Sequence, residues 1–295
     1  MSAKLAAPLA RVCRVLGAPR STVHHRRRHL QLVAAGQAGV RPGPTGSLGD
    51  DDLVDLIRAV IKESPFAGEG YRKIRARLRR EHGVRVSGKR VLRLLRQHGL
   101  LAPQRAHRRR KPRLHDGRIV TDAPDLCWGT DATMAWTVDD GWVWVFDLVD
   151  HHSCEAWAHV AKVGDRFAAL QPIYDAVVDR HGVLEPDVAR GLSVRHDWGS
   201  QYRSHHFVGS LAWLGITDSP AFPGEPECNG CAERFIKTLK EQCLWARTYR
   251  TIDELRQAVA DFVELYNREW LIERLGHRTP RETHEQWLAG KEQAA

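Results

Sequence analysis

Hydrophobic residues recur at helical spacing through most of the first hundred positions. Residues 9–30 predict two short helices around a glycine turn, the second capped by Ser21 or Thr22, which is the outline of a helix-turn-helix. Residues 34–49 are rich in Gly and Pro without an apolar period and predict a linker. Three more amphipathic helices are expected within residues 50–102. Their apolar positions are Leu53, Leu56, Ile57, Val60, Ile61, Ile74, Leu78, Val91, Leu94 and Leu95.

Beyond residue 118 the pattern changes to alternating and continuous apolar runs of the kind that form strands. The expected order is three strands, a helix, a short strand closed by Asp197, a small helix, another strand and further helices. This order predicts an α/β fold with a mixed sheet flanked by helices, in which the first and fourth strands can be neighbours. The segments are 127–137, 141–153, 155–161, 165–182, 192–200, 207–214 and 215–222.

The division of the chain into parts follows from these changes of pattern. We expect a partial helix-turn-helix, a linker, a helical domain, a basic tether, a sheet-containing core with C-terminal helices, and a tail. Their predicted bounds are 1–33, 34–49, 50–102, 103–117, 118–285 and 286–295.

Positive charge is concentrated ahead of the strands. Residues 71–114 hold 17 Lys and Arg but one acid, Glu81, whereas the whole chain has a net charge of +9. Such a stretch repels itself unless a polyanion neutralises it, which favours nucleic acid over a merely soluble basic surface. We expect the helical basic residues to meet a DNA groove and the tether to hold phosphates. These residues are Arg72, Lys73, Lys89, Arg90, Arg93, Arg108, Arg109 and Arg110.

Other classes of protein fit the sequence less well. No apolar run approaches the roughly 20 residues of a membrane span, and the first residues do not form a secretory signal, so we expect a cytoplasmic protein. Six scattered cysteines favour reduced thiols, and Cys228 and Cys231 lack the second pair of a structural zinc site. The tryptophans at 128, 136, 142, 144 and 157 are expected in the sheet core, and the histidines are given no role.

Three carboxylates are candidates for a metal site. Asp131 lies within the first predicted strand and Asp197 ends the fourth, where strand neighbours would bring them together. Glu233 opens a helix and shares a face with Lys237 and Lys240, although a Glu to Lys pair four residues apart is also a common surface feature. Carboxylates with substrate phosphate oxygens are the usual ligands of Mg²⁺.

Taken together, these segments resemble the DDE transposases and retroviral-type integrases, most closely the second-reading-frame transposases of the insertion-sequence-three family. The matching stretches are "WGTDAT", "RHDWGSQYRS" and "CNGCAERFIKTLKEQ", with 35 residues between Asp197 and Glu233. The likeness extends to "GYRKIRARLRREHG" before the core and "YNREWLIERLGHRTPRE" after it. The chain departs from the family at Trp198, where a small or polar residue is more usual, and it lacks the acid that commonly precedes Asn229.

The resemblance implies an RNase H-like five-stranded core whose Asp131, Asp197 and Glu233 bind two Mg²⁺ or Mn²⁺ ions and catalyse cleavage and strand transfer of DNA. It implies that Lys240 and Lys237 hold DNA near the metals. The implied partners are double-stranded DNA at terminal inverted repeats and at the target, a second copy of the chain, and an upstream-reading-frame protein. On DNA the protein would associate with the bacterial nucleoid.

Two alternatives stay open. A metal-dependent nuclease that only hydrolyses DNA could use the same three carboxylates. A catalytically inactive, transposase-derived repressor would keep the basic helices, although it would have no need for the acids.

Overall fold

The computed structural model describes residues 9–35, 48–103, 121–221 and 229–294, in two units divided at Gly49. The first unit contains α1 (Leu9–Val15) and α2 (Arg20–Ala34), joined through Gly17 at φ +63°. This pair of helices agrees with the prediction. Because α2 begins at Arg20, Ser21 and Thr22 lie inside its first turn, so the predicted cap is wrong.

The second unit starts with three helices, α3 (Asp50–Glu63), α4 (Tyr71–His82) and α5 (Gly88–Gln97). Gly83 ends α4 in the left-handed conformation at φ +67°, and Ser87 caps α5 by accepting a hydrogen bond from the Arg90 amide. The helices pack through a common set of buried apolar side chains: Leu53, Val54, Ile57, Val60, Ile74, Leu78, Val91, Leu94 and Leu95.

A five-stranded mixed sheet follows, as predicted. The strands are β1 (Cys127–Thr137), β2 (Gly141–Asp150), β3 (Ala156–Ala161), β4 (Ser193–His196) and β5 (Thr217–Pro220). Their order is β3-β2-β1-β4-β5; β1 and β2, like β2 and β3, are antiparallel, whereas β4 is parallel to both β1 and β5. The first and fourth strands are therefore neighbours.

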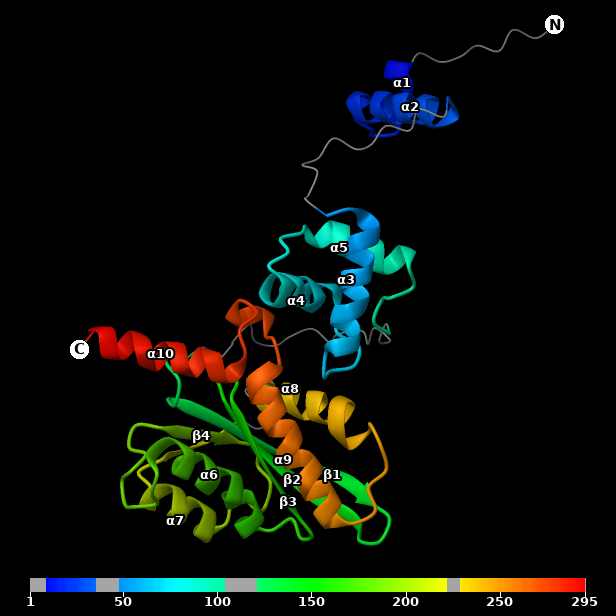
Figure 1. The fold of residues 1–295 in the computed structure, drawn as a ribbon. Coiled ribbons are helices and arrows are strands. Elements are labelled where there is room, and N and C mark those ends of the chain that lie inside the picture. The colour runs from blue at the N-terminus through cyan, green and yellow to red at the C-terminus, as the bar shows by residue number, and fades with distance from the viewer. Residues whose placement is uncertain (1–8, 36–47, 104–120, 222–228, 295) are drawn as a thin grey trace, which may run out of the picture. The chain divides into compact units, whose positions relative to one another are not determined.

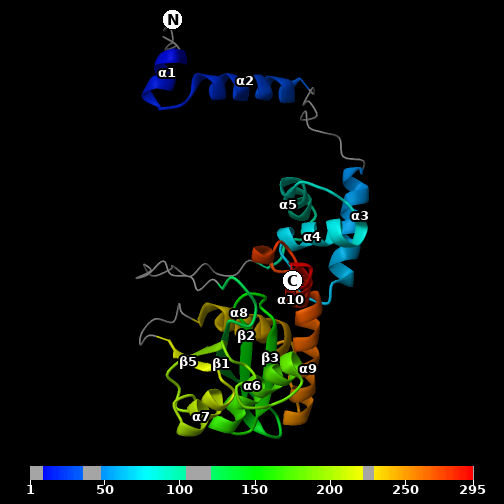
Figure 2. The same cartoon turned by 90° about the vertical axis from the view of Figure 1, so that its left-hand side faces the viewer.

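Helices cover both faces of this sheet (Figures 1 and 2). On one face, α6 (Arg166–His181) and α7 (His205–Trp213) enclose a core that includes Trp128, Phe146 and Phe207. On the other, α8 (Gly230–Leu239), the π-helix η2 (Lys240–Leu244) and α9 (Ile252–Glu269) pack on alternate residues of β2. The short 3-10 helix η3 (Glu273–Leu275) and α10 (Pro280–Ala294) complete the unit, and α10 continues beyond the predicted end of the core.

The three-helix segment packs directly on the C-terminal part of the sheet domain. Phe66 is buried in the core on the α9 face and meets Trp270 edge-on, with ring centroids 4.8 Å apart. The Gln242 amide accepts from the Ala67 backbone N–H and donates to the Ala67 carbonyl, at 3.0 Å each. Arg72 also forms a 2.8 Å ion pair with Glu273. Apolar, polar and charged contacts thus hold the helical segment in a defined place.

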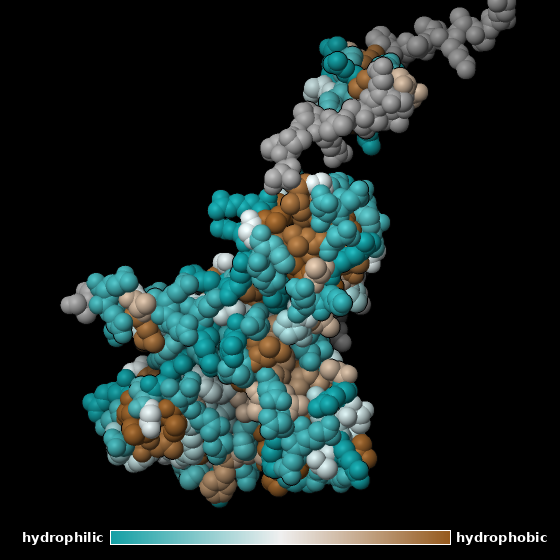
Figure 3. Space-filling view, viewed as in Figure 1, coloured by the Kyte–Doolittle hydropathy of each residue, from teal (hydrophilic) through white to brown (hydrophobic). Residues whose placement is uncertain are grey.

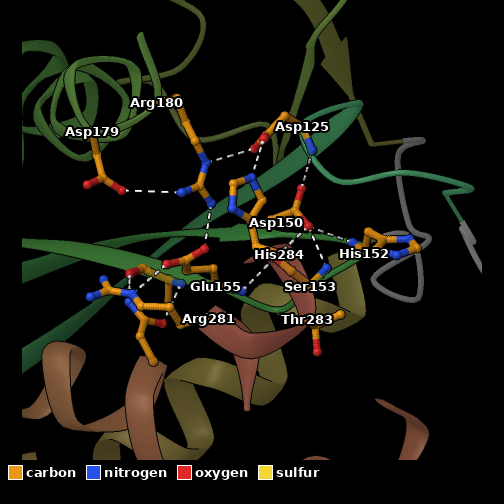
Figure 4. Close-up of polar contacts among 12 residues, drawn as sticks. Asp125, Asp150, His152, Ser153, Glu155, Asp179, Arg180, Arg281, Thr283 and His284 are labelled. Atoms are coloured by element: carbon orange, nitrogen blue, oxygen red, sulfur yellow. Dashed lines mark hydrogen bonds and ion pairs between the residues drawn. The ribbon is translucent and has the colours of Figure 1, made fainter. Parts of the chain in front are cut away.

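Buried charges tie β3, α6 and α10 together (Figure 4). The Glu155 carboxylate is 2% exposed and accepts from Arg180 at 2.6 Å and from Arg281 at 3.2 Å. Arg180 also donates to Asp125, which meets the His284 ring at 3.0 Å. The network satisfies each charge with an opposite one, which is the condition under which buried charges are tolerated.

The tryptophans only partly follow the prediction. Trp128 is buried, and Trp144 and Trp157 pack against the same core. Trp136 and Trp142 at the β1–β2 hairpin are 52% and 58% exposed, so placing them in the core was wrong. They contact each other edge-on instead, with centroids 5.5 Å apart, because the hairpin extends beyond the covering helices.

The surface is mostly hydrophilic on the side shown in Figure 3, with brown apolar patches over the three-helix segment and over the sheet domain. Within the described ranges, no helix is both long and apolar enough to cross a membrane.

Candidate active site on the β1 and β4 strands

Asp131 and Asp197 meet where β1 and β4 run side by side. The parallel register pairs Gly129 with Arg195, so each aspartate follows two residues after that pair. Burial raises the pKa of the Asp131 carboxyl, and the negative charge of Asp197 raises it further. The Ala132 amide donates to Asp131 at 2.8 Å and opposes this rise, as does the positive charge of Lys240. The charge of Asp197 thus disfavours the Asp131 anion, a situation that a bound cation would relieve.

The loop after β4 presents Asp197 to solvent. β4 ends at His196, and the exposed Asp197 side chain accepts a 2.8 Å hydrogen bond from the Gly199 amide. A side chain at position 199 would place its Cβ only 2.6 Å from the Gln201 amide nitrogen. The same Cβ would lie 3.0 Å from the Asp197 Oδ1 atom, so glycine at position 199 leaves the space beside the Asp197 carboxylate open.

The helix that carries Glu233 is anchored next to Asp131. Asn229, at the start of α8, donates from its side-chain amide to the Thr130 carbonyl at 2.8 Å. The approach is so close that a Cβ on Gly129 would lie 2.4 Å from the Asn229 Oδ1 atom. Glu233 follows four residues later and therefore lies on the same side of the helix, where it is exposed.

The three candidate carboxylates come from three different elements, because Asp131 lies in β1, Asp197 follows β4 and Glu233 lies in α8. Among the side chains in the described segments, no three of the types His, Cys, Asp and Glu lie close enough to hold one metal ion. Glu233 stands on the neighbouring helix, whose apolar side is fixed by buried Phe235 and Leu239.

The two predicted lysines lie at the C-terminal end of this helix. Lys237 is exposed in the last turn of α8, and Lys240 begins η2, with its ammonium 6.0 Å from the centroid of the Trp245 ring. Lys240 is close enough to Asp131 to lower the pKa of that carboxyl. Positive charge is therefore present at the rim of the site, as DNA phosphates would require.

Asp147 is a carboxyl near this site that the sequence did not single out. It lies on β2 directly across from Asp131 and is 1% exposed. Neither of its oxygens has a hydrogen-bond partner among the described residues. Burial, followed by the charge of Asp131, holds the pKa of Asp147 well above its ordinary value. The sequence feature that could have indicated a buried carboxyl is that Asp147 falls in phase with the alternating apolar positions 143, 145 and 149 of β2.

Cys231 lies beside Cys154, and both thiols are free and near the Arg274 guanidinium. The Arg274 Nη2 atom lies 2.5 Å from the Cys154 sulfur and 3.9 Å from the Cys231 sulfur. A hydrogen bond from Cys231 and the charge of Arg274 lower the pKa of Cys154 to about 7. Cys228 lies outside the described residues. An arginine beside both thiols disfavours a cation there, and sequence spacing offered no sign of the pairing.

The predicted DNA-binding residues on the helices lie in different surroundings. Arg90 and Arg93 both pair with Asp50, at 2.8 and 2.7 Å, and Lys89 is exposed. Lys73 lies 2.9 Å from the centroid of the Trp270 ring, and burial lowers its pKa to about 7. Arg108, Arg109 and Arg110 lie outside the described residues.

A cleft of about 410 Å³ lies beside Arg72, between α4, α5 and the η3 segment. Basic side chains predominate in its lining, which consists of Tyr71, Arg72, Arg75, Gly88, Lys89, Leu92, Glu273 and His277.

Comparison with known proteins agrees with a helical segment followed by an integrase-like core. Residues 49–110 match the HTH-like domain family, and residues 214–280 match the integrase core domain family. Transposase InsD of insertion element IS2A/D/F/H/I/K from Escherichia coli is 30% identical over 249 residues, which cover 79% of this chain and 78% of that protein. The chain belongs to the insertion-sequence-three transposase family. InsD of IS2-9 from Escherichia coli strain K12 is also 30% identical, over 79% of this chain and 76% of the relative.

Solved structures with a similar fold come from viral integrases. The HTLV-2 integrase catalytic core domain in complex with magnesium, in its trimeric form, has a TM-score of 0.42 and 17% identity, covering 55% of this transposase-family chain and 98% of the integrase domain. A chain of the simian T-cell lymphotropic virus intasome in complex with PP2A regulatory subunit B56 gamma has a TM-score of 0.46 and 19% identity, with coverages of 73% and 70%.

Proposed function

We propose that this chain is a metal-dependent DNA transposase that cleaves the ends of its element and joins them to target DNA. The observation that carries the proposal is the meeting of Asp131 and Asp197 on the neighbouring strands β1 and β4 at the centre of the sheet, beside the helix that carries Glu233. The HTH-like segment supports binding of double-stranded DNA at the terminal inverted repeats. Two ends must be held together for joining, which favours a homo-oligomer on DNA, and the proposal includes an upstream-frame protein as a further partner.

The carboxylates fit Mg²⁺ or Mn²⁺. Burial and the charge of Asp197 make an isolated Asp131 anion unfavourable, and hard cations prefer carboxylate oxygens. Asp131, Asp197 and Glu233 would hold two such ions, which supply activation of the attacking oxygen and stabilisation of the leaving oxygen. Glu233 would complete the set by reaching from α8 toward the two aspartates.

The side chains of the protein have separate tasks in this proposal. The Ala132 and Gly199 amides orient Asp131 and Asp197, and Asn229 keeps α8 beside β1. Lys240 and Lys237 hold DNA phosphates near the carboxylates. Water attacks the phosphorus at the element end and releases a 3′-hydroxyl. That hydroxyl then attacks a target phosphodiester, so one P–O bond forms as another breaks.

A strand-transfer assay with labelled DNA carrying the element's own ends tests the proposal. Joined products in Mg²⁺ or Mn²⁺ are expected from the wild type and not from Glu233→Gln, while DNA binding persists in both. Glu241→Gln, a matched change in η2, is expected to retain joining. Cleavage without joining would favour the hydrolytic nuclease, and binding without either reaction in the wild type would favour the repressor.

A further inference from the structure

Trp198 is an exposed aromatic side chain next to a proposed metal ligand. It directly follows Asp197 in the turn after β4, and 47% of its surface is accessible. An indole that only filled the core would be buried, as Trp128 is. Its position on the rim of the carboxylate site means that a DNA strand reacting there would pass beside the ring.

The ring is held in place on two sides. Its Nε1–H donates to the Ala221 carbonyl at 2.5 Å, and the Ala221 amide in turn donates to the His196 carbonyl at 2.8 Å. The Arg203 guanidinium lies 5.7 Å from the ring centroid. A fixed, half-exposed aromatic plane with an adjacent cation has the two parts that a nucleotide needs, a stacking surface and a phosphate contact.

We propose that Trp198 stacks on an unpaired base adjacent to the reacting phosphate, and that Arg203 contacts the phosphate of that nucleotide. The proposal rests on the proposed function, because it places the DNA end at Asp131 and Asp197. Stacking does not require a particular base, since every base has an aromatic face. Trp198 is thus a positioning residue that holds the strand in register with the carboxylates.

The contact between Trp198 and a base is tested by measuring binding to a set of DNA ends, each of which lacks one base at a different position. Full-length protein carrying Glu233→Gln, which prevents turnover, is compared with the same protein also carrying Trp198→Leu. The DNA contains the element's end with a single abasic nucleotide moved through the positions around the cleavage site. On intact DNA, Trp198→Leu is expected to weaken binding roughly 5- to 150-fold, the range for one stacked base. At one abasic position the two proteins should bind equally.

Two variants separate stacking from structural support. Trp198→Phe keeps an aromatic face and loses the hydrogen bond to Ala221, so it should bind nearly as well as the parent if stacking matters. If the indole only braces the turn, Phe should be as defective as Leu. Trp213→Leu is the matched control, because Trp213 is also 47% exposed and lies on α7; it should not change the abasic profile.

The outcomes distinguish this inference from the proposed function. Unchanged binding in Trp198→Leu, or an equal loss at every abasic position, would overturn the stacking contact. Wild-type joining activity alongside such a result would leave the transposase function intact. A position-specific effect without any joining by the wild type would support the base contact and refute the proposed chemistry.

Discussion

Asp147 faces Asp131 across the β2–β1 pair, with the two residues in direct register on the same face of the sheet. Asp131 reaches the rim of the proposed site, whereas Asp147 is fully buried and has no hydrogen-bond partner within the described segments. The strand pairing thus places one ionisable group in the site and a second one directly behind it. Burial and the neighbouring Asp131 charge raise the pKa of the Asp147 carboxyl well above its ordinary value, which favours its neutral acid form.

Replacing Asp147 with valine should stabilise the protein. The change removes an unsatisfied polar group, which costs about 1–3 kcal/mol when buried, and valine suits a β-strand. Because the pKa of Asp147 is raised in the folded state, the wild type should lose stability as pH rises above the ordinary aspartate pKa. Urea unfolding at several pH values measures both effects. Asp147→Asn should remove this pH dependence and gain less stability, and a destabilised valine variant at neutral pH would contradict the argument.

Divalent metal should stabilise the folded chain in a pH-dependent way. A ligand at a hundred times its Kd adds about 2.7 kcal/mol to the free energy of unfolding. The raised pKa of Asp131 means that protons compete with metal, so the Mg²⁺- or Mn²⁺-induced rise in Tm should grow as pH increases through that pKa. Thermal unfolding with and without metal gives the measurement. Asp131→Asn should abolish the rise, and an equal rise in that variant would place the ion elsewhere.

Periodicity predicted the elements and the strand neighbours well, because both depend on local pattern and on the order of segments. The register between strands depends on turns and bulges, so the opposition of Asp131 and Asp147 could not be predicted. The extent to which the helices cover the sheet also cannot be predicted from the sequence, so the exposure of individual apolar side chains cannot be predicted either. Phe167 lies in the first turn of α6, within the predicted helix 165–182, yet it is 54% exposed and its ring lies 4.8 Å from the His206 ring, between centroids.

In the candidate site, too, contacts between neighbouring strands could be predicted, whereas contacts that depend on helix packing could not. Asp131 and Asp197 could be paired in advance because adjacent strands carry them. The distance of Glu233 from them depends on how α8 lies across β1, which the Asn229 contact with Thr130 helps to determine. The contact between Cys154 and Cys231 joins two segments far apart in the chain, and only tertiary packing brings them together.

Removing the Glu155 carboxylate should strongly destabilise the fold. Glu155→Ala leaves Arg281 without one of its two carboxylate partners and Arg180 without its 2.6 Å contact, in surroundings where Arg180 is only 10% exposed. Breaking a buried ion pair from one side costs about 3–5 kcal/mol. The urea midpoint, at unchanged m-value, reports this loss. Asp253→Ala breaks an exposed pair with Arg256 and should cost less than about 1 kcal/mol; equal losses would contradict the role of burial.

The Cys154 thiol should titrate at an unusually low pH. The hydrogen bond from Cys231 and the nearby Arg274 guanidinium stabilise its thiolate, so its pKa is about 7. Ultraviolet absorbance of the thiolate, as the difference between the wild type and Cys154→Ser, should show a midpoint near that value. Arg274→Gln should move the midpoint upward, because it removes the charge that favours the thiolate. Cys127→Ser is the control: burial raises the pKa of Cys127, so its loss should leave the low-pH titration in place. A single midpoint near the ordinary cysteine pKa in the wild type would show that Arg274 and Cys231 do not act on Cys154.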